Sequence, residues 1–187
     1  MLVIVGLGNP DKIYLNTYHN MGYIHIDQFA SKYNIEFTKK KYNSMCGEGF
    51  IDGEKVVLLK PTTYMNLSGK AVAEIINSLK LSPSQVLVIY DDIDMPLSTI
   101  RTRNNGSAGT HNGMRDIVAK IGTTEFPRIR IGIGKPQFGN LADFVLSKVS
   151  SDNMKILESN FDKVNNEIEY FLKNKKLEEK TIKWYQI

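Results

Sequence analysis

Short runs of apolar residues alternate along the chain with segments in which apolar residues recur three and four positions apart. The short runs are rich in β-branched residues and predict strands at residues 2–6, 47–51, 56–60, 86–90, 98–103 and 128–132. Asp52 and Gly53 lie between two of these runs, and this dipeptide favours the positive φ angles of a tight hairpin turn. At least one pair of strands is therefore antiparallel.

Helical periodicity appears in four segments. Their apolar stripes are Ile26, Phe29, Ala30 and Tyr33; Val72, Ile75, Ile76 and Leu79; Met114, Ile117, Val118 and Ile121; and Leu157, Phe161, Val164, Ile168 and Phe171. The last stripe predicts one helix over residues 152–173. Ser68 is a candidate cap for the second helix, which Ser82-Pro83 would end. The pattern predicts an α/β fold, with a twisted mixed β-sheet flanked by helices on both faces.

Length and composition are typical of a folded globular protein. The chain has 187 residues, of which 42% are hydrophobic, and this length suits one core, so we expect a single domain spanning residues 1–187. Cys46 is the one cysteine and cannot form an internal disulfide. No signal peptide is recognisable, and no run approaches the roughly 20 apolar residues that span a bilayer. We expect a cytoplasmic protein that does not bind membranes.

The basic excess lies in one part of the chain. The net charge is +4, but residues 151–187 hold seven lysines and seven acids, which cancel. Residues 96–148 hold eight basic residues against three acids. A phosphate backbone, if one binds, is expected to bind to this segment.

Polar residues follow three of the predicted strands, at the edge where α/β sheets usually bind ligands. They are Asn9, Tyr14, His19 and Asn20 after the first strand, Tyr64 and Asn66 after the third, and Asp91, Asp92 and Asp94 after the fourth. A glycine-bearing loop at residues 104–109 leads to His111 and Asn112 before a helix. This loop and the loop at residues 135–140 are candidate walls of a site.

Other classes of site fit the sequence less well. The first loop lacks the third glycine of a dinucleotide fingerprint, and Pro10 would interrupt a helix there. Ser107 does not lie in a Gly-x-Ser-x-Gly elbow. No His or Cys pair has metal-ligand spacing, so we expect neither a metal nor another cofactor. One histidine with acidic and amide neighbours remains, which is the set that a water-activating hydrolase needs.

Six motifs, in one order along nearly the whole chain, resemble those of the bacterial peptidyl-tRNA hydrolases. They are Val5-Gly6-Leu7-Gly8-Asn9-Pro10, Thr17-Tyr18-His19-Asn20-Met21-Gly22, the segment from Lys60 to Gly69, Asp91-Asp92-Ile93-Asp94, the segment from Gly106 to Gly113, and the segment from Arg128 to Gly134. The family usually has glycine at the position of Thr110, and often histidine at that of Tyr90. Thr110 could stiffen the loop that bears Asn112.

The resemblance implies an activity and a role for each matching residue. The implied reaction is hydrolysis of the ester that joins an N-blocked peptide to the 3′-terminal ribose of tRNA. His19 would be the base and Asp91 its partner, since a carboxylate on the other ring nitrogen fixes the tautomer of an imidazole. The implied substrate-binding residues are Asn9, Tyr14, Asn20, Tyr64, Met65, Asn66 and Asn112. His25 is predicted to be structural, and His111 to support the loop with at most a minor role.

Arg101, Arg103 and Arg130 match positions at which the family carries basic residues toward the tRNA acceptor stem. Phosphate contacts of this kind would suit an enzyme that accepts many tRNAs, and we expect it to be a monomer. Two alternatives remain. A non-catalytic RNA-binding module on the same fold could dispense with His19 or Asp91. A hydrolase of another ester or amide would not need the basic segment.

Overall fold

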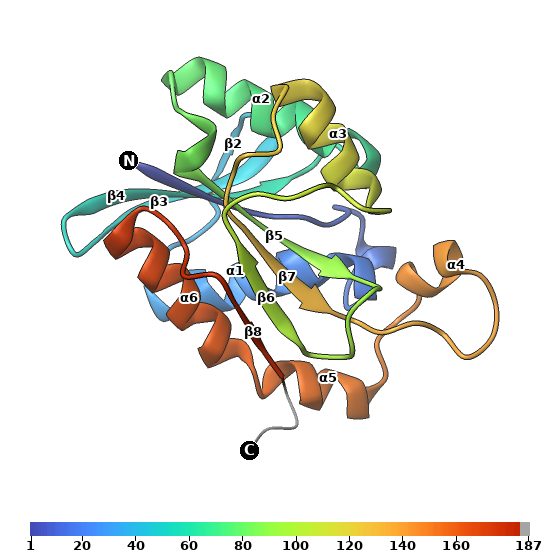
Figure 1. Cartoon of the computed structure of the whole chain (residues 1–187). Coiled ribbons are helices and arrows are strands. Elements are labelled where there is room, and N and C mark those ends of the chain that lie inside the picture. Colours follow the sequence, from blue (N-terminus) through green and yellow to red (C-terminus); the bar gives the residue numbers. More distant parts are fainter. Residues whose placement is uncertain (184–187) are drawn as a thin grey trace.

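The computed structural model describes residues 1–183 as an eight-stranded sheet with helices on both faces (Figure 1). The strands are β1 (Leu2–Gly6), β2 (Lys39–Lys41), β3 (Ser44–Ile51), β4 (Glu54–Pro61), β5 (Val86–Asp92), β6 (Ile100–Arg103), β7 (Arg128–Gly132) and β8 (Lys180–Ile182). The helices are α1 (Met21–Lys32), α2 (Ser68–Leu79), α3 (Asn112–Ile121), α4 (Leu141–Val145), α5 (Ser151–Glu158) and α6 (Phe161–Asn174). Short 3₁₀ turns are η1 (Lys12–Tyr14), η2 (Tyr18–Asn20), η3 (Met65–Leu67) and η4 (Pro83–Gln85).

The sheet is mixed, as the hairpin predicted. Its order is β2-β3-β4-β1-β5-β7-β6-β8, in which β4, β1, β5 and β7 run parallel and the outer strands pair antiparallel. Asp52 and Gly53 form the turn between β3 and β4 with φ angles of 48° and 80°. Four parallel strands at the centre bring four carboxyl ends to one edge of the sheet.

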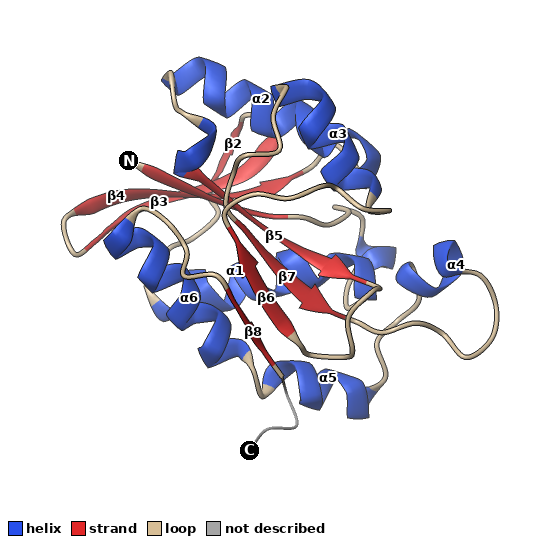
Figure 2. Ribbon diagram, in the orientation of Figure 1, coloured by secondary structure: helices blue, strands red, loops and turns tan. Residues whose placement is uncertain are grey.

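Helices lie on both faces of the sheet (Figure 2), and an apolar layer holds them on each face. On one face, α1, α5 and α6 pack Phe29, Leu157 and Ile168 against alternate residues of the strands. On the other face, α2 and α3 pack Ile75 and Ile117 against the residues between them. Helices therefore cover both faces, which confirms the predicted fold class. Within residues 1–183, no helix is both long and apolar enough to cross a membrane.

The single helix predicted for residues 152–173 is wrong, because the chain forms α5 and α6 with a break at Ser159 and Asn160. The buried amide of Asn160 donates to the carbonyl oxygen and the hydroxyl of Ser98, at 2.7 and 2.8 Å. Ser98 has a φ of 64°, so β6 begins at Ile100 and not at residue 98 as predicted. A contact between distant segments thus interrupts a continuous helical stripe.

The predicted ends of the second helix also need correction. Ser68 is the first residue of α2, not its cap, and its hydroxyl donates to the Met65 carbonyl at 2.7 Å. The helix ends at Leu79 because Lys80 adopts a left-handed conformation with a φ of 53°, before Ser82-Pro83. The short elements β2, β8 and α4 have no counterpart in the apolar pattern. Strands β2 and β8 form the two edges of the sheet, and no residue of α4 is buried.

Close backbone contact brings the start of α1 against the central strands. A Cβ atom on Gly6 would lie 2.3 Å from the Gly22 carbonyl oxygen, and one on Gly22 would lie 2.4 Å from the Ile89 carbonyl oxygen. Only glycine fits at either position without displacing backbone. The start of α1 is thereby pressed onto the ends of β1 and β5, which places His19 beside Asp91.

Candidate active site

The predicted site residues converge at the carboxyl edge of the parallel strands. His19 lies in η2 after β1, and Asp91 lies near the end of β5. Nδ1 of His19 is 2.8 Å from Oδ2 of Asp91. The side chain of Asp91 is 1% exposed and that of His19 is 11% exposed. The pair expected from the sequence therefore forms, with its imidazole at the edge of solvent.

Charge and hydrogen bonding fix the protonation of this pair. Burial alone would raise the pKa of Asp91, but the charges and hydrogen bonds of His19 and His111 outweigh burial and hold that pKa well below its usual range. An ionised carboxylate can only accept, so Nδ1 of neutral His19 carries the proton and Nε2 is the free base. Burial opposes a charged His19, but the charge of Asp91 and the hydrogen bond to it raise the pKa of His19 above its ordinary value.

His111 contacts the same carboxylate, although only a minor, loop-supporting role was predicted for it. Its Nε2 lies 3.0 Å from Oδ1 of Asp91, and its Nδ1 accepts the backbone N–H of Met114 at 3.2 Å as the cap of α3. The cap leaves the proton on Nε2, which donates to Asp91. His111 is therefore more than a loop support. Its place directly before Asn112, at the start of a helix, is the feature that could have indicated this role.

His19, Asp91 and His111 place three possible metal-ligating atoms within 4.8 Å of one another, the one such group among residues 1–183. A metal on Nε2 of His111 would need that nitrogen free of its proton. The ring proton would then move to Nδ1, which faces the N–H of Met114. The hydrogen bonds of this cluster suit proton transfer better than metal binding.

Hydrogen bonds to Met65 and Asn20 hold Asn9 from two sides. Its Oδ1 accepts the backbone N–H of Met65 at 2.8 Å. The backbone N–H of Asn9 donates to Oδ1 of Asn20 at 2.8 Å, and Nδ2 of Asn20 donates to the carbonyl oxygen of Asn9 at 3.0 Å. These bonds leave Nδ2 of Asn9 as the donor for a ligand. Asn20 is 2% exposed, so its position beneath the first loop suits orienting Asn9 rather than touching a ligand.

The remaining substrate candidates surround this edge. Asn66 lies in η3 and Asn112 begins α3, and both side chains are exposed. Met65 is buried, and Tyr14 is half-buried in η1. Tyr64 is 46% exposed, and its hydroxyl donates to Asp11 at 2.8 Å, so it links the loop after β4 to the loop after β1. Its φ of 64° is unusual for an aromatic residue and marks a constrained turn.

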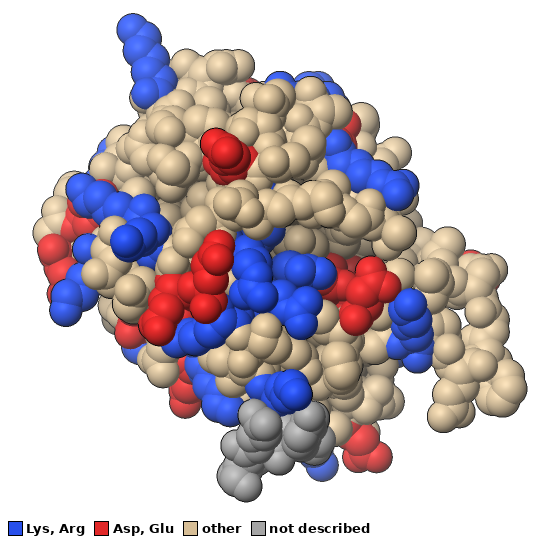
Figure 3. Space-filling model, in the orientation of Figure 1, with Lys and Arg blue, Asp and Glu red and all other residues tan. Residues whose placement is uncertain are grey.

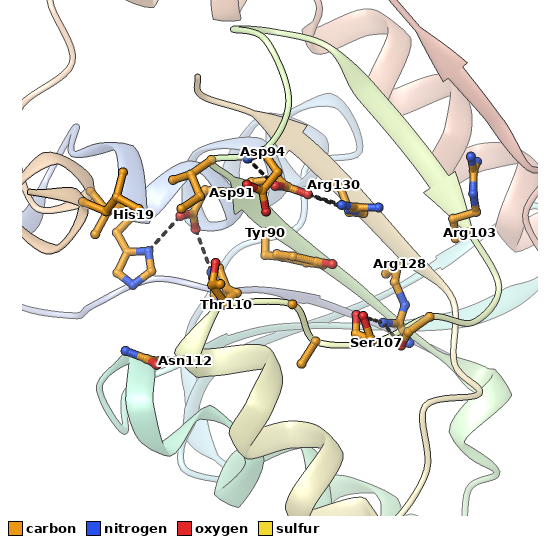
Figure 4. Close-up of a pocket in the computed structure, with 18 of the residues that line it drawn as sticks. His19, Tyr90, Asp91, Asp94, Arg103, Ser107, Thr110, Asn112, Arg128 and Arg130 are labelled. Atoms are coloured by element: carbon orange, nitrogen blue, oxygen red, sulfur yellow. Dashed lines mark hydrogen bonds and ion pairs between the residues drawn. The ribbon is translucent and has the colours of Figure 1, made fainter. Parts of the chain in front are cut away.

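A cavity of about 300 Å³ opens beside the His19 and Asp91 pair. Figure 4 shows His19 and Asn112 at one end and Arg103, Arg128 and Arg130 at the other, with Tyr90 between them. The ring of Tyr90 meets His111 edge-on at 5.0 Å, and burial raises the pKa of Tyr90 to about 12. The loop predicted at residues 104–109 forms one wall of the cavity through residues 105–109, whereas no residue of the loop at residues 135–140 lines this cavity, so that loop is not the wall that the sequence suggested.

The three predicted tRNA-contacting arginines differ in their partners. Arg130 pairs with Asp92 through Nε at 2.6 Å, whereas Arg101 donates to the Thr181 hydroxyl at 3.0 Å. Arg103 donates to the carbonyl oxygens of Thr102 and Lys180, so no carboxylate neutralises it among the described residues. Basic side chains gather at the middle of the face in Figure 3, with acidic groups on either side. Arg103 therefore offers an uncompensated positive charge to the cavity.

Arg128 also lines the cavity, although it was not among the predicted site residues. It is 1% exposed, and its guanidinium donates to backbone carbonyls of four residues. These are Gly106, Ser107, Thr124 and Phe126. The buried guanidinium thus holds the glycine-bearing loop against β7. Burial of a basic residue cannot be recognised from an apolar pattern, because arginine is usually exposed.

An α/β domain with a carboxylate-oriented imidazole at the carboxyl edge of its parallel strands defines this chain as a hydrolase-like protein. The family model for peptidyl-tRNA hydrolase matches residues 3–186. The chain belongs to this family.

Individual relatives agree with the family assignment. A peptidyl-tRNA hydrolase of Alkaliphilus oremlandii is 47% identical over 93% of this chain and 94% of its own length. One of Agathobacter rectalis is 53% identical over 84% of this chain and 86% of its own. The crystal structure of peptidyl-tRNA hydrolase from Acinetobacter baumannii superposes with a TM-score of 0.87 at 36% identity, covering 93% of this chain and 89% of that one.

Proposed function

We propose that this protein hydrolyses the ester bond between an N-blocked peptide and the 3′-terminal ribose of tRNA, and so recycles tRNA from prematurely released peptidyl-tRNA. The observation that carries the proposal is the 2.8 Å contact between Nδ1 of His19 and Oδ2 of Asp91, which leaves Nε2 as a base. Family membership supplies the substrate. The proposed unit is the whole chain, residues 1–187, acting as one domain.

In the proposed reaction, Nε2 of His19 removes a proton from water as the water oxygen attacks the ester carbonyl carbon. The tetrahedral intermediate carries a negative oxygen, which an amide donor can stabilise. Nδ2 of Asn9 is the donor best placed by its hydrogen bonds, and loss of such a donor costs about 3 kcal/mol in similar sites. The imidazolium, stabilised by Asp91, then returns the proton to the ribose oxygen as the ester bond breaks.

The other side chains would bind the two halves of the substrate. We assign Asn66 and Asn112 to the peptide amides, because an exposed amide side chain can both donate to and accept from a peptide group. Met65 and Tyr14 would line the peptide and terminal-nucleotide sides, and Tyr64 would border the peptide. Asn20 would act through Asn9, given its buried bonds to the backbone of that residue.

Arg101, Arg103 and Arg130 would contact phosphates of the acceptor stem. Such contacts position a nucleic acid without reading its sequence, which suits a substrate class with many tRNA bodies. The uncompensated charge of Arg103 supports this assignment most directly. We propose that the protein acts as a monomer in the cytoplasm, where tRNA is charged and used.

The test compares N-acetyl-aminoacyl-tRNA with unblocked aminoacyl-tRNA. We expect release of the amino acid from the blocked substrate alone, and almost none from a His19→Ala variant. Comparable cleavage of both substrates would contradict the proposed specificity. Binding of tRNA without cleavage would support an RNA-binding module, and cleavage of small N-acyl amino acids would support a different hydrolase.

A further inference from the structure

Asn66 and Asn112 lie on separate segments, and a contact behind them ties these segments together. Oδ2 of Asp116, one turn into α3, accepts the backbone N–H of Gly69 in the first turn of α2 at 2.8 Å. Gly69 follows Asn66 by three residues, and Asp116 follows Asn112 by four. Each end of this hydrogen bond is therefore one helical turn from one of the two amides.

The backbones of Gly69 and Asp116 lie so close together that no Cβ atom fits between them. A Cβ atom on Gly69 would lie 2.3 Å from the carbonyl oxygen of Asp116. A second close contact lies nearer the amides, because a Cβ atom on Gly113 would lie 2.6 Å from the sulfur of Met65. Met65 and Gly113 are the chain neighbours of Asn66 and Asn112. Two glycine contacts and one carboxylate bond thus hold the two segments close together beside the amides.

The carboxylate of Asp116 has favourable electrostatics for this task. Its side chain is 17% exposed, and Lys120 donates to both of its oxygens at 2.8 Å from within the same helix. The N–H that it accepts belongs to the first turn of α2, where a negative charge is stabilised by the helix dipole. The bond to Gly69 joins the two helices, whereas the pair with Lys120 stays within α3.

We propose that Asp116 is a positioning residue, which sets the spacing of the Asn66 and Asn112 side chains through its hydrogen bond to Gly69. The assignment of these amides to the peptide rests on the proposed function. A misplacement of about 1 Å can reduce catalysis by as much as about a hundredfold even when the change is far from the reacting atoms. The loss of one tie in a tightly packed contact is expected to have a smaller effect.

The test uses Asp116→Ala, with Lys120→Ala as a matched control that removes the pair within α3 but keeps the bond to Gly69. We expect Asp116→Ala to lower kcat/KM for N-acetyl-aminoacyl-tRNA about tenfold, with an unchanged pH profile, because His19 and Asp91 are untouched. Lys120→Ala is expected to stay within about twofold of the parent protein. Equal losses in the two variants would overturn the proposal.

A double-mutant cycle separates positioning from general damage. In an Asn112→Ala background, Asp116→Ala is expected to reduce kcat/KM by less than about threefold, because the amide that it positions is gone. Full additivity of the two changes would overturn the proposal. If Asp116→Ala does not fold, Asp116→Asn keeps an acceptor oxygen and is expected to retain most of the activity, whereas Gly69→Ala forces the two backbones apart without removing a side chain of the site and is expected to lower kcat/KM. Equal activity of these two variants would overturn the proposal.

A structural measurement distinguishes failure of this inference from failure of the proposed function. In a crystal structure of Asp116→Ala, the Cα atoms of Asn66 and Asn112 are expected to move relative to each other, while His19 and Asp91 stay in contact. An unchanged spacing would overturn the inference whatever the substrate. An inactive parent protein would instead count against the proposed function alone.

Discussion

His111 donates to the oxygen of Asp91 that His19 leaves free, at 3.0 Å. Each oxygen of this buried carboxylate therefore accepts one imidazole N–H, and neither ring can turn without leaving a charged oxygen without a partner. Unpaired buried charges are costly, so the three side chains hold one another in place. The pair expected from the sequence is in fact part of a three-residue network.

Loss of His111 should change the pH dependence of the reaction. His111→Ala removes one of the two N–H donors that stabilise the charge of Asp91. The carboxylate then stabilises the imidazolium of His19 more strongly, which raises the already elevated pKa of His19 further. The acid limb of the pH profile of kcat/KM should then move to higher pH. His111→Asn offers an amide donor and should show a smaller shift. An acid limb at the parent position in both variants would show that His111 does not act through Asp91.

Asp91→Asn should nearly abolish turnover while the fold is kept. An amide group can present N–H donors to Nδ1 of His19, which favours the tautomer with a protonated Nε2, and that tautomer is not a base. The loss in kcat is expected to lie between about a hundredfold and ten-thousandfold, by analogy with other histidine and aspartate pairs. Single-turnover kinetics would measure it. A variant within tenfold of the parent protein would contradict the orienting role of Asp91.

His25 should make the protein less stable in mild acid. It is fully buried, its Nδ1–H donates to the Met21 carbonyl at 2.9 Å, and burial lowers its pKa to about 4. The native state keeps His25 neutral while the unfolded chain takes up a proton near pH 6.5, so the stability from this residue is present above pH 6.5 and is lost toward pH 4. Each pH unit in that window removes about 1.4 kcal/mol.

Urea unfolding at pH 6.5 and pH 5 measures the effect of His25. The free energy of unfolding of the parent protein should fall by about 2 kcal/mol more than that of His25→Gln between these pH values. Comparison with the variant cancels the contributions of other titrating groups, including His19, whose raised pKa acts in the opposite direction. Parallel pH dependences for the two proteins would show that His25 protonates freely in the native state.

Arg103 should contribute to tRNA binding without affecting the chemical step. Arg103→Ala removes a cation that has no carboxylate partner among the described residues, so KM should rise while kcat stays nearly constant. The plot of log affinity against log salt concentration has a negative slope, and the magnitude of this slope should decrease by about one, as expected for loss of one phosphate contact. Lys120→Ala, whose charge is already paired with Asp116, is the control and should leave the slope unchanged. An unchanged slope for Arg103→Ala would exclude a phosphate contact.

Local pattern was sufficient for the central architecture. The strands β1 and β7 have the predicted bounds, and the Asp52-Gly53 turn has the predicted φ angles, because short β-branched runs and turn chemistry act between neighbouring residues. Helical periodicity alone failed at Asn160, where two hydrogen bonds to Ser98 divide a continuous apolar stripe. The apolar pattern also missed β2 and β8, since edge strands bury little and show no apolar run.

The motifs, met in order along the chain, determined the family and the identities of the candidate site residues, because side-chain chemistry is written directly in the sequence. The motifs also predicted the contact between His19 and Asp91, but the other contacts of these residues were decided by the tertiary structure. The second imidazole on Asp91, the buried guanidinium of Arg128 behind the loop and the bond from Gly69 to Asp116 all join segments far apart in the chain. Such contacts depend on the crossing of packed elements, and no local pattern of residues encodes that geometry.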